Sequence, residues 1–385
     1  MRQLASIQKI KQLDPILGKD RIVLASFESV GWKVICGKSD FQIGDLCIYC
    51  EVDSILPVKP EFEFLRKRCW APKWNGFRIR NMSMSGIYSE GIVFPISILT
   101  DKYPNHVLTE GIDVTEEIGV IKFDPEALEE EKLIKQDKHG PIIRYLLRFK
   151  FIKNLFYPKR AKRGWPEWAS QTDETRAQIL PYIYEDYQGE EVYATEKIDG
   201  QSLTAGYVNN RFSLCSRKLG LPKPSKIKGK FAAEKSKYWQ TVGKYELEQK
   251  LKKASKDLGI SLYIQGEQCG PTIQGNKYGF TELKFFVYNI FDVTHKRYFG
   301  LNEMVEFCKQ YDLKMVQWLF VGLFEWKSID ELVMYAKGKS VYADIPREGV
   351  VIRSVDPKPP GHKMSNMLSF KVINPDFSLK YGNEE

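Results

Sequence analysis

The sequence predicts an α+β protein in which an antiparallel β-barrel domain precedes a mixed domain with a mostly antiparallel sheet. Three observations lead to this prediction. Residues 1–123 contain short β-rich runs separated by turn residues. A highly charged segment follows at 124–164. From residue 165 onward, strand-like runs alternate with amphipathic segments of helical period.

The N-terminal region reads as a small barrel of the oligonucleotide/oligosaccharide-binding (OB) type. Its β-rich runs include GWKVICG, DLCIYCEV, GFRIRNMSM and EGIVFPI, and no long helical segment interrupts them. A generic β-sandwich is the alternative, because the two folds share this pattern. Cys47 and Cys50 lie three residues apart in one run, which directs their thiols to opposite faces of a strand. We therefore expect two buried cysteines here and no zinc site.

The charged segment at 124–164 is predicted to be a helical connector or insertion. It begins with the acidic run DPEALEEE, and Arg144 to Arg163 then includes eight basic residues and no acidic one. A second basic stretch runs from Arg217 to Lys237, with Glu234 as its only acid. Basic residues interspersed with aromatic ones are typical of a surface that binds a polyanion. The alternative for the connector is a solvated pair of helices.

The last part of the chain, 165–385, is predicted to be one mixed domain. A helix is expected to begin near Thr172, Asp173 and Glu174. YELEQKLKKASKDLG predicts an amphipathic helix that ends at Gly259, and LNEMVEFCKQYDL and SIDELVMYAKG predict two more. Strands are expected between and after these helices, in runs such as KFFVYNIFDV and GVVIRS.

Composition limits the class of protein. The 385 residues are 43% hydrophobic and 28% charged, with a formal net charge of +9, as in ordinary globular proteins. No apolar run approaches the roughly 18 residues that cross a bilayer, and the N-terminus lacks the apolar core of a signal peptide. We therefore expect a cytoplasmic protein that is not associated with a membrane.

The run Thr195-Glu196-Lys197-Ile198-Asp199-Gly200 is the most informative in the chain. A lysine amine attacks phosphorus only when it is unprotonated, and an ordinary lysine has a pKa near 10.4. Nearby cations or desolvation lower that pKa. Lys197 lies between two strand-like runs and so is a candidate nucleophile on a rigid element. The alternative is a surface lysine before an ordinary Asp-Gly turn.

Further candidates follow downstream, beside strand-like runs. Glu267 and Glu348 could bind sugar hydroxyls or hydrated Mg²⁺, which prefers oxygen ligands. Arg217, Arg353 and Lys371 could neutralise phosphate oxygens. Tyr288, in FFVYNIFD, could stack on a base, although each of these residues could also be an ordinary surface or core side chain.

Taken together, these motifs resemble those of ATP-dependent RNA ligases in the covalent nucleotidyl transferase superfamily. EKIDG is similar to motif I, which implies that Lys197 accepts AMP and that Asp199 lies at the metal. GEQCGPTIQ is similar to motif III and FFVYNIFD to motif IIIa, which implies that Glu267 contacts the ribose or the metal waters and that Tyr288 stacks on adenine. Thr195, Glu196 and Gly200 are then expected to line the nucleotide site.

The resemblance extends to the end of the chain. REGVVIR is similar to motif IV, which implies that Glu348 lies near the metal and Arg353 near phosphate, and SFKVINP is similar to motif V, which implies that Lys371 contacts the α-phosphate. Arg217 stands where the family has an arginine near the RNA 5′-phosphate. The implied metal ligands Asp199, Glu267 and Glu348 are expected to act through water.

Two residues depart from the family pattern. Ser369 occupies a place in motif V where a lysine is common, and Asn289 stands where many relatives have aspartate. Ser369 puts one phosphate contact in question, which Lys363 or Lys380 could replace.

Domain order indicates the branch of the superfamily. DNA ligases and capping enzymes have an OB barrel after motif V, whereas only 14 residues follow Lys371 here. An N-terminal barrel resembles the RNA ligase group known from Deinococcus and Naegleria. The resemblance implies ATP and Mg²⁺ or Mn²⁺ as cofactors, RNA in a nicked duplex as partner and no obligate protein partner. A DNA ligase, a GTP-dependent guanylyltransferase and a non-catalytic RNA-binding protein are the alternatives.

Overall fold

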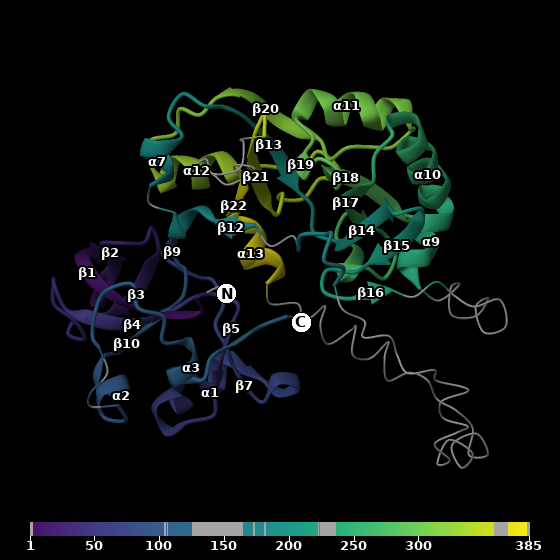
Figure 1. The fold of residues 1–385 in the computed structure, drawn as a ribbon. Helices are drawn as coiled ribbons and strands as arrows, with labels where there is room; N and C mark the ends of the chain where they lie inside the picture. Colours follow the sequence, from purple (N-terminus) through teal and green to yellow (C-terminus); the bar gives the residue numbers. More distant parts are fainter. Residues whose placement is uncertain are drawn as a thin grey trace, which may run out of the picture.

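Two groups of β-sheets make up the molecule, one N-terminal and one C-terminal (Figure 1). The computed structural model describes residues 3–103, 105, 107–124, 165–171, 174–180, 182–221, 223, 236–357 and 369–382. Apart from Asp124, the predicted connector at 124–164 lies outside the described residues, as does most of the basic stretch at 217–237. In the described residues, no helix is long and apolar enough to span a bilayer.

The N-terminal domain is built from short antiparallel strands. One sheet has the order β10-β4-β1-β2-β3, a second has the order β11-β5-β7-β6, and β8 pairs with β9. Their bounds are β1 Ala5–Ile16, β2 Lys19–Phe27, β3 Lys33–Gly37, β4 Leu46–Cys50, β5 Ser54–Pro57, β6 Trp70–Ala71, β7 Gly76–Arg78, β8 Met82–Met84, β9 Ile87–Ser89, β10 Ile92–Pro95 and β11 Ile121–Lys122. Short helical turns connect them: η1 Pro60–Leu65, α1 Arg66–Cys69, η2 Pro72–Trp74, α2 Ser97–Thr100 and α3 Thr115–Ile118.

The first sheet curls because β1 is long and bends at a bulge near Ile10. Its first half pairs with β4 and its second half with β2. The backbone N–H of Glu90, just before β10, donates to the carbonyl of Lys33 at the start of β3 (2.8 Å), so the two edges of the sheet approach each other. This arrangement confirms the predicted antiparallel, OB-like β domain.

Both cysteines of the C-x-x-C pair are fully buried in β4, as predicted. Cys47 packs in the core that contains Trp32 and Tyr49, and Cys50 packs in the separate core that contains Ile7 and Phe62. The strand therefore places the two thiols in different cores.

The C-terminal domain contains two larger sheets with the orders β12-β22-β21-β13-β20 and β16-β15-β14-β17-β18-β19. Within them β12 and β22 are parallel and the other pairs are antiparallel, as the sequence predicted. The strands are β12 Thr175–Arg176, β13 Glu191–Lys197, β14 Gln201–Val208, β15 Arg211–Cys215, β16 Gly220–Leu221, β17 Leu262–Cys269, β18 Lys284–Asp292, β19 Arg297–Tyr298, β20 Trp318–Leu323, β21 Gly349–Ser354 and β22 Ser369–Ile373.

Helices cover the outer faces of both sheets (Figure 1). The helical elements are η3 Ala177–Ile179, α7 Ile183–Asp186, α9 Lys237–Lys244, α10 Leu247–Leu258, η4 Gln274–Asn276, α11 Leu301–Gln310, α12 Ile329–Ala336 and α13 Pro375–Tyr381. α10 ends at Gly259, whose φ of 69° suits the left-handed conformation that closes many helices. The predicted helices α10, α11 and α12 are thus confirmed, whereas the helix expected near Glu174 is wrong, because the strand β12 begins at Thr175.

Contacts between the two domains involve α12, α13 and the segment that contains β12. Lys33 pairs with Asp330 (2.9 Å), and the Tyr88 hydroxyl donates to Asp376 at the start of α13. In Figure 1, α13 (yellow) lies where the N-terminal lobe meets the rest of the molecule. The two domains are therefore held together next to the carboxyl end of motif V.

Candidate active site

One cavity of about 370 Å³ contains every residue that the sequence analysis assigned to the site. It opens between the two sheets of the C-terminal domain and faces the N-terminal domain. The predicted residues that line it are Thr195, Glu196, Lys197, Asp199, Gly200, Arg217, Glu267, Tyr288, Glu348, Arg353 and Lys371. Residues that lie up to 176 positions apart in the sequence thus surround one space.

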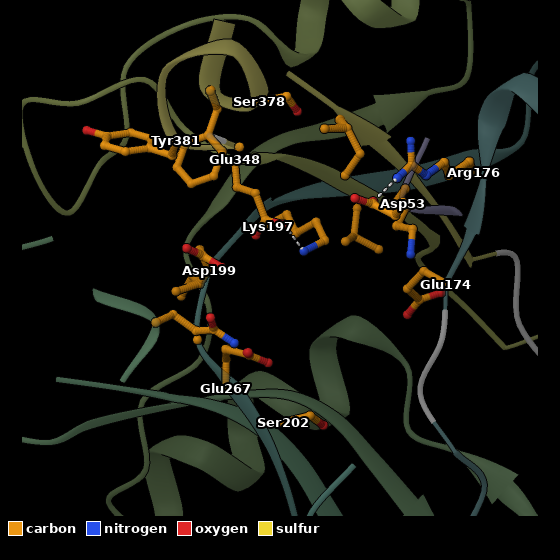
Figure 2. Close-up of a pocket in the computed structure, with 18 of the residues that line it drawn as sticks. Asp53, Glu174, Arg176, Lys197, Asp199, Ser202, Glu267, Glu348, Ser378 and Tyr381 are labelled. Carbon is orange, nitrogen blue, oxygen red and sulfur yellow. Dashed lines mark hydrogen bonds and ion pairs between the residues drawn. The ribbon is translucent and has the colours of Figure 1, made fainter. Parts of the chain in front are cut away.

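Lys197 is the last residue of β13, which lies between β21 and β20 in its sheet. Glu348 immediately precedes β21, the neighbouring strand, and its carboxylate accepts a hydrogen bond from the Lys197 Nζ (Figure 2). Gly349 lies directly opposite Lys197 in the register. A Cβ on Gly349 would come within 2.2 Å of the Val372 carbonyl oxygen, so only glycine fits between these strands.

The charge around Lys197 differs from the expectation. Burial by itself lowers the pKa of the Lys197 ammonium, but Glu348, Glu267 and Asp199 together more than offset that effect, so the net shift is upward. Desolvation, one of the effects expected to lower this pKa, is present, but the charged side chains nearest to Lys197 are carboxylates and outweigh it. Lys197 is therefore held as an ammonium in the protein alone.

The Asp199-Gly200 turn is held by the loop that follows β17. Tyr278 accepts a hydrogen bond from the backbone N–H of Asp199 (2.8 Å), and the Lys277 Nζ lies 2.5 Å from Asp199 Oδ2. A Cβ on Gly200 would lie 2.5 Å from the Gln268 carbonyl oxygen, so glycine lets the turn pack directly on β17. Burial and the nearby Glu348 raise the pKa of Asp199 to about 6, despite the opposing effect of Lys277.

Three carboxylates therefore surround Lys197: Asp199, Glu267 and Glu348 (Figure 2). Oxygen donors of this kind suit a hard divalent cation. In the described residues, however, no three acidic, His or Cys side chains stand close enough to hold an ion directly. Within the described residues, Glu348 Oε2 is buried and has no hydrogen-bond partner. The donor set thus fits a cation that keeps part of its water shell.

Tyr288 and Asn289 lie at an irregularity of β18, where Gly266 of β17 pairs with Val287 and Gln265 pairs with Asn289. Tyr288 lines the cavity, and its hydroxyl lies 2.8 Å from Ser202 Oγ. Asn289 is buried, and its amide donates to Gln265 on β17 (3.3 Å). Asn289 does not line the cavity, so its departure from the family pattern changes a buried contact next to the pocket and not the pocket lining itself.

Arg353 and Ser369 share one partner that the sequence analysis did not name. The Arg353 Nη2 donates to Glu174 Oε1 (2.9 Å), and the Ser369 hydroxyl donates to the other oxygen of the same carboxylate. Arg353 also donates to Thr195 Oγ1 (3.3 Å). Lys363 lies outside the described residues, and Lys380 does not line the cavity, so neither is placed as a substitute for the missing motif V lysine.

Glu196 points toward the far side of β13 from Lys197 but still borders the cavity. Its Oε2 accepts from the Val341 backbone N–H (2.8 Å), and its Oε1 is buried with no hydrogen-bond partner in the described chain. Burial raises the pKa of this carboxyl. An unused buried acceptor beside the cavity is suited to a ligand N–H.

The wall opposite the strands comes from the N-terminal domain, which the sequence analysis did not anticipate. Asp53 pairs with Arg176 of β12 (2.9 Å) and with Arg78 of β7 (3.6 Å). Figure 2 shows the Asp53–Arg176 pair beside Glu174, across the cavity from Asp199. Further lining residues from this side are Arg80, Asn81, Lys122, Phe123 and Asp124. Arg176 belongs to β12 of the C-terminal domain, and no candidate site motif named in the sequence analysis includes Asp53 or Arg78.

Comparisons with known proteins agree with this geometry. Residues 190–373 match the family model described as RNA ligase, and residues 4–96 match a model described as an OB-fold domain. No curated protein sequence matches the chain significantly.

Among solved structures, Naegleria gruberi RNA ligase with PPi superposes with a TM-score of 0.77 at 24% identity, over 100% of both chains. Mutants of that ligase with ATP and Mn (TM-score 0.75, 23% identity, 99% of this chain and 98% of that one) and with AMP and Mn (0.76, 23%, 99% and 100%) are similar. At this identity the likeness shows the fold, which is an N-terminal OB domain followed by a mixed-sheet domain.

Proposed function

We propose that this protein, whose residues 190–373 match the RNA ligase family model, joins a 3′-hydroxyl end to a 5′-phosphate end with ATP, through a lysyl-AMP intermediate on Lys197. The observation that carries this proposal is the single cavity in which all the predicted residues surround the Lys197 amine. The Naegleria structures, with PPi, with ATP and with AMP, have the same fold.

The reaction begins when the Lys197 nitrogen, freed of its proton, attacks the α-phosphorus of ATP. An N–P bond forms, the bond to pyrophosphate breaks, and AMP stays on the lysine. The 5′-phosphate of the nucleic acid then takes the AMP, and the 3′-hydroxyl finally displaces AMP to seal the strand. A covalent intermediate divides one difficult condensation into easier transfers.

The nucleotide is positioned by residues on both sheets. Tyr288 offers a ring on which adenine stacks, and the unused oxygen of Glu196 is an acceptor for a base N–H. Lys371 and Arg217 line the same cavity as cations for phosphate oxygens. Arg176 and Arg78 add positive charge from the opposite wall.

Asp199, Glu267 and Glu348 are the residues that would hold a hydrated Mg²⁺ or Mn²⁺. Such a cation supplies positive charge that neutralises phosphate oxygens and favours the unprotonated lysine. The Glu348 carboxylate must release Lys197 before the attack, because a lysine that donates to a carboxylate cannot use its nitrogen lone pair. Lys277 remains on Asp199 and limits the negative charge that Lys197 experiences.

We propose RNA in a nicked duplex as the substrate, with ribose at the 3′-hydroxyl end. The N-terminal domain supports this proposal, because it places Arg80 and Lys122 at the cavity and OB domains bind oligonucleotides. A 2′-hydroxyl distinguishes an RNA end from a DNA end in a wide A-form minor groove.

Incubation with α-labelled ATP or GTP tests the first step. Label from ATP that stays on the denatured protein, and is absent from Lys197→Met, is the expected result. Label from GTP alone would indicate a guanylyltransferase, and label from neither nucleotide with Mg²⁺ or Mn²⁺ would indicate a non-catalytic RNA-binding protein. Sealing of nicks with ribose or deoxyribose at the last 3′ nucleotides tests the substrate, and equal rates on all-DNA nicks would contradict the RNA proposal.

A further inference from the structure

Glu174 forms a compact polar unit with two residues of the neighbouring strands. Its two carboxylate oxygens accept separately from Arg353 on β21 and from Ser369 on β22. Arg353 and Ser369 are direct partners across the two strands, so the register brings both donors to one carboxylate. We call Glu174, Arg353 and Ser369 the Glu174 unit.

The guanidinium of Arg353 is enclosed on several sides. Its side chain is only 3% exposed. One nitrogen reaches Glu174, another reaches Thr195 Oγ1, and the guanidinium carbon lies 5.7 Å from the centre of the Tyr288 ring. A cation at this distance from an aromatic face is attracted to it and restrains its position.

We propose that Glu174 and Ser369 are positioning residues that hold Arg353 against Tyr288, so that Arg353 supports the base-stacking ring and does not bind phosphate. This inference rests on the proposed function, because it assigns parts of the ATP site. It differs from the sequence expectation for Arg353, which placed this residue near phosphate.

Electrostatics favours this assignment. A phosphate that approached Arg353 would also approach the Glu174 carboxylate. The negative charges of the phosphate and the carboxylate would then repel each other. Removing Glu174 from the pair would leave a buried guanidinium without its counter-ion, which is costly. Lys371, Arg217 and Arg176 line the same cavity and supply other cations for the phosphates.

The unit also explains Ser369. A lysine at this place would bring a second cation to Glu174 and compete with Arg353 for the same carboxylate. A serine hydroxyl donates one hydrogen bond and adds no charge. Serine at position 369, which departs from the family pattern, therefore lets the Glu174 carboxylate pair with Arg353 without competition from a lysine at that position.

Two ligands separate the base from the phosphates: adenosine, which lacks phosphate, and inorganic pyrophosphate, which lacks a base. Calorimetry with each ligand and Mg²⁺ would be performed on the AMP-free full-length protein and on Glu174→Gln, Ser369→Ala and Arg353→Lys. We expect Glu174→Gln and Arg353→Lys to weaken adenosine binding by about fivefold or more and to leave pyrophosphate binding within about twofold. Ser369→Ala, which keeps the ion pair, should weaken adenosine binding by about twofold.

The matched control is Glu191→Gln, which makes the same chemical change at an exposed position of β13 and should alter neither affinity. Weaker pyrophosphate binding with unchanged adenosine binding would overturn the inference and return Arg353 to the phosphates. Equal loss of both ligands would also overturn it, since that indicates general damage to the site. If Glu174→Gln does not fold, Ser369→Ala and Arg353→Lys decide the question.

If the proposed function itself is wrong, the experimental result differs from the outcomes described above. In that case the unaltered protein would bind neither adenosine nor pyrophosphate and would take no label from ATP. Measured KM and kcat for lysine adenylylation add a second check, because a base-positioning role raises the KM for ATP in Glu174→Gln more than it lowers kcat.

Discussion

The two walls of the cavity differ in how the chain builds them. The wall that contains Lys197 consists of strand ends and the turns beside them, and Lys197 and its three carboxylate neighbours lie in short recognisable motifs. The opposite wall includes Asp53, in the turn before β5, Arg78 of β7 and Arg176 of β12, which meet through ion pairs. The comparison shows that the position of Lys197 is set by local backbone geometry, whereas the facing charges are brought there by domain docking.

Replacing the nucleophile should have the largest effect on the strand wall. Lys197→Met should reduce lysine adenylylation by at least about a thousandfold, because no other group forms the N–P bond. Label retained from α-labelled ATP on the denatured protein measures this. Lys256→Met, an exposed lysine on α10, is the control and should label normally. Full labelling of Lys197→Met would show that the chemistry lies elsewhere in the cavity.

The turn after Lys197 tests how tightly the strand wall is packed. Gly200→Ala should lower the free energy of unfolding by about 1–3 kcal/mol, because its Cβ would lie 2.5 Å from a backbone oxygen of β17. Denaturant unfolding measures the change. Gly243→Ala, in the helix α9 with open space around its Cβ, is the matched control and should gain up to about 1 kcal/mol. Similar results for the two variants would contradict the close approach.

The facing wall should contribute less to the free energy of unfolding than the strand wall does, and its contribution should depend more on charge. Asp53→Asn keeps the shape and the left-handed backbone at φ 62°, but it removes the counter-ion of Arg176 and Arg78. We expect a loss of about 1–2 kcal/mol in unfolding free energy, measured by denaturant unfolding, since hydrogen bonds to charged groups are worth this much. Lys197 labelling should fall far less than in Lys197→Met. An unchanged unfolding midpoint would indicate that docking does not depend on this carboxylate.

Glu90, at the docking surface behind that wall, offers a test based on pH. Burial raises the pKa of Glu90 to about 7, with Arg176 and Lys33 opposing the shift. The folded protein therefore holds this proton more tightly than the unfolded chain, so the stability from Glu90 is present at low pH and declines as pH rises from about 4.5 to 7. Unfolding measured across this range should show the decline, and Glu90→Gln should reduce it. Identical profiles for the two proteins would contradict a buried, protonated Glu90.

The sequence predicted the strand wall well because its chemistry depends on short-range geometry. A lysine at the end of a strand and a glycine in the following turn lie within a few residues, so EKIDG carries their arrangement. The helices α10 and α11 were predictable for the same reason, since their period and the ending at Gly259 are local. The predicted residues of the other motifs reached the same cavity because adjacent strands align them.

Other features of the molecule could not be predicted from the sequence. The helix expected at Glu174 was wrong, because pairing of Thr175 and Arg176 with β22 outweighs a local capping signal. The upward pKa shift of Lys197 and the sharing of Glu174 by Arg353 and Ser369 depend on distances across several strands. No sequence pattern predicted that Asp53 lines the cavity.

The sequence by itself thus determined the order of the two β-sheet domains and the set of residues that line the cavity around Lys197. The tertiary structure decided the charge state of Lys197, the partner of Arg353 and the composition of the facing wall. The physical reason is that these interactions act over different separations in the sequence. Strand periodicity and turn chemistry act between residues that are close in the chain. Ion pairing and burial act between whichever groups the packed sheets and the docked N-terminal domain bring together.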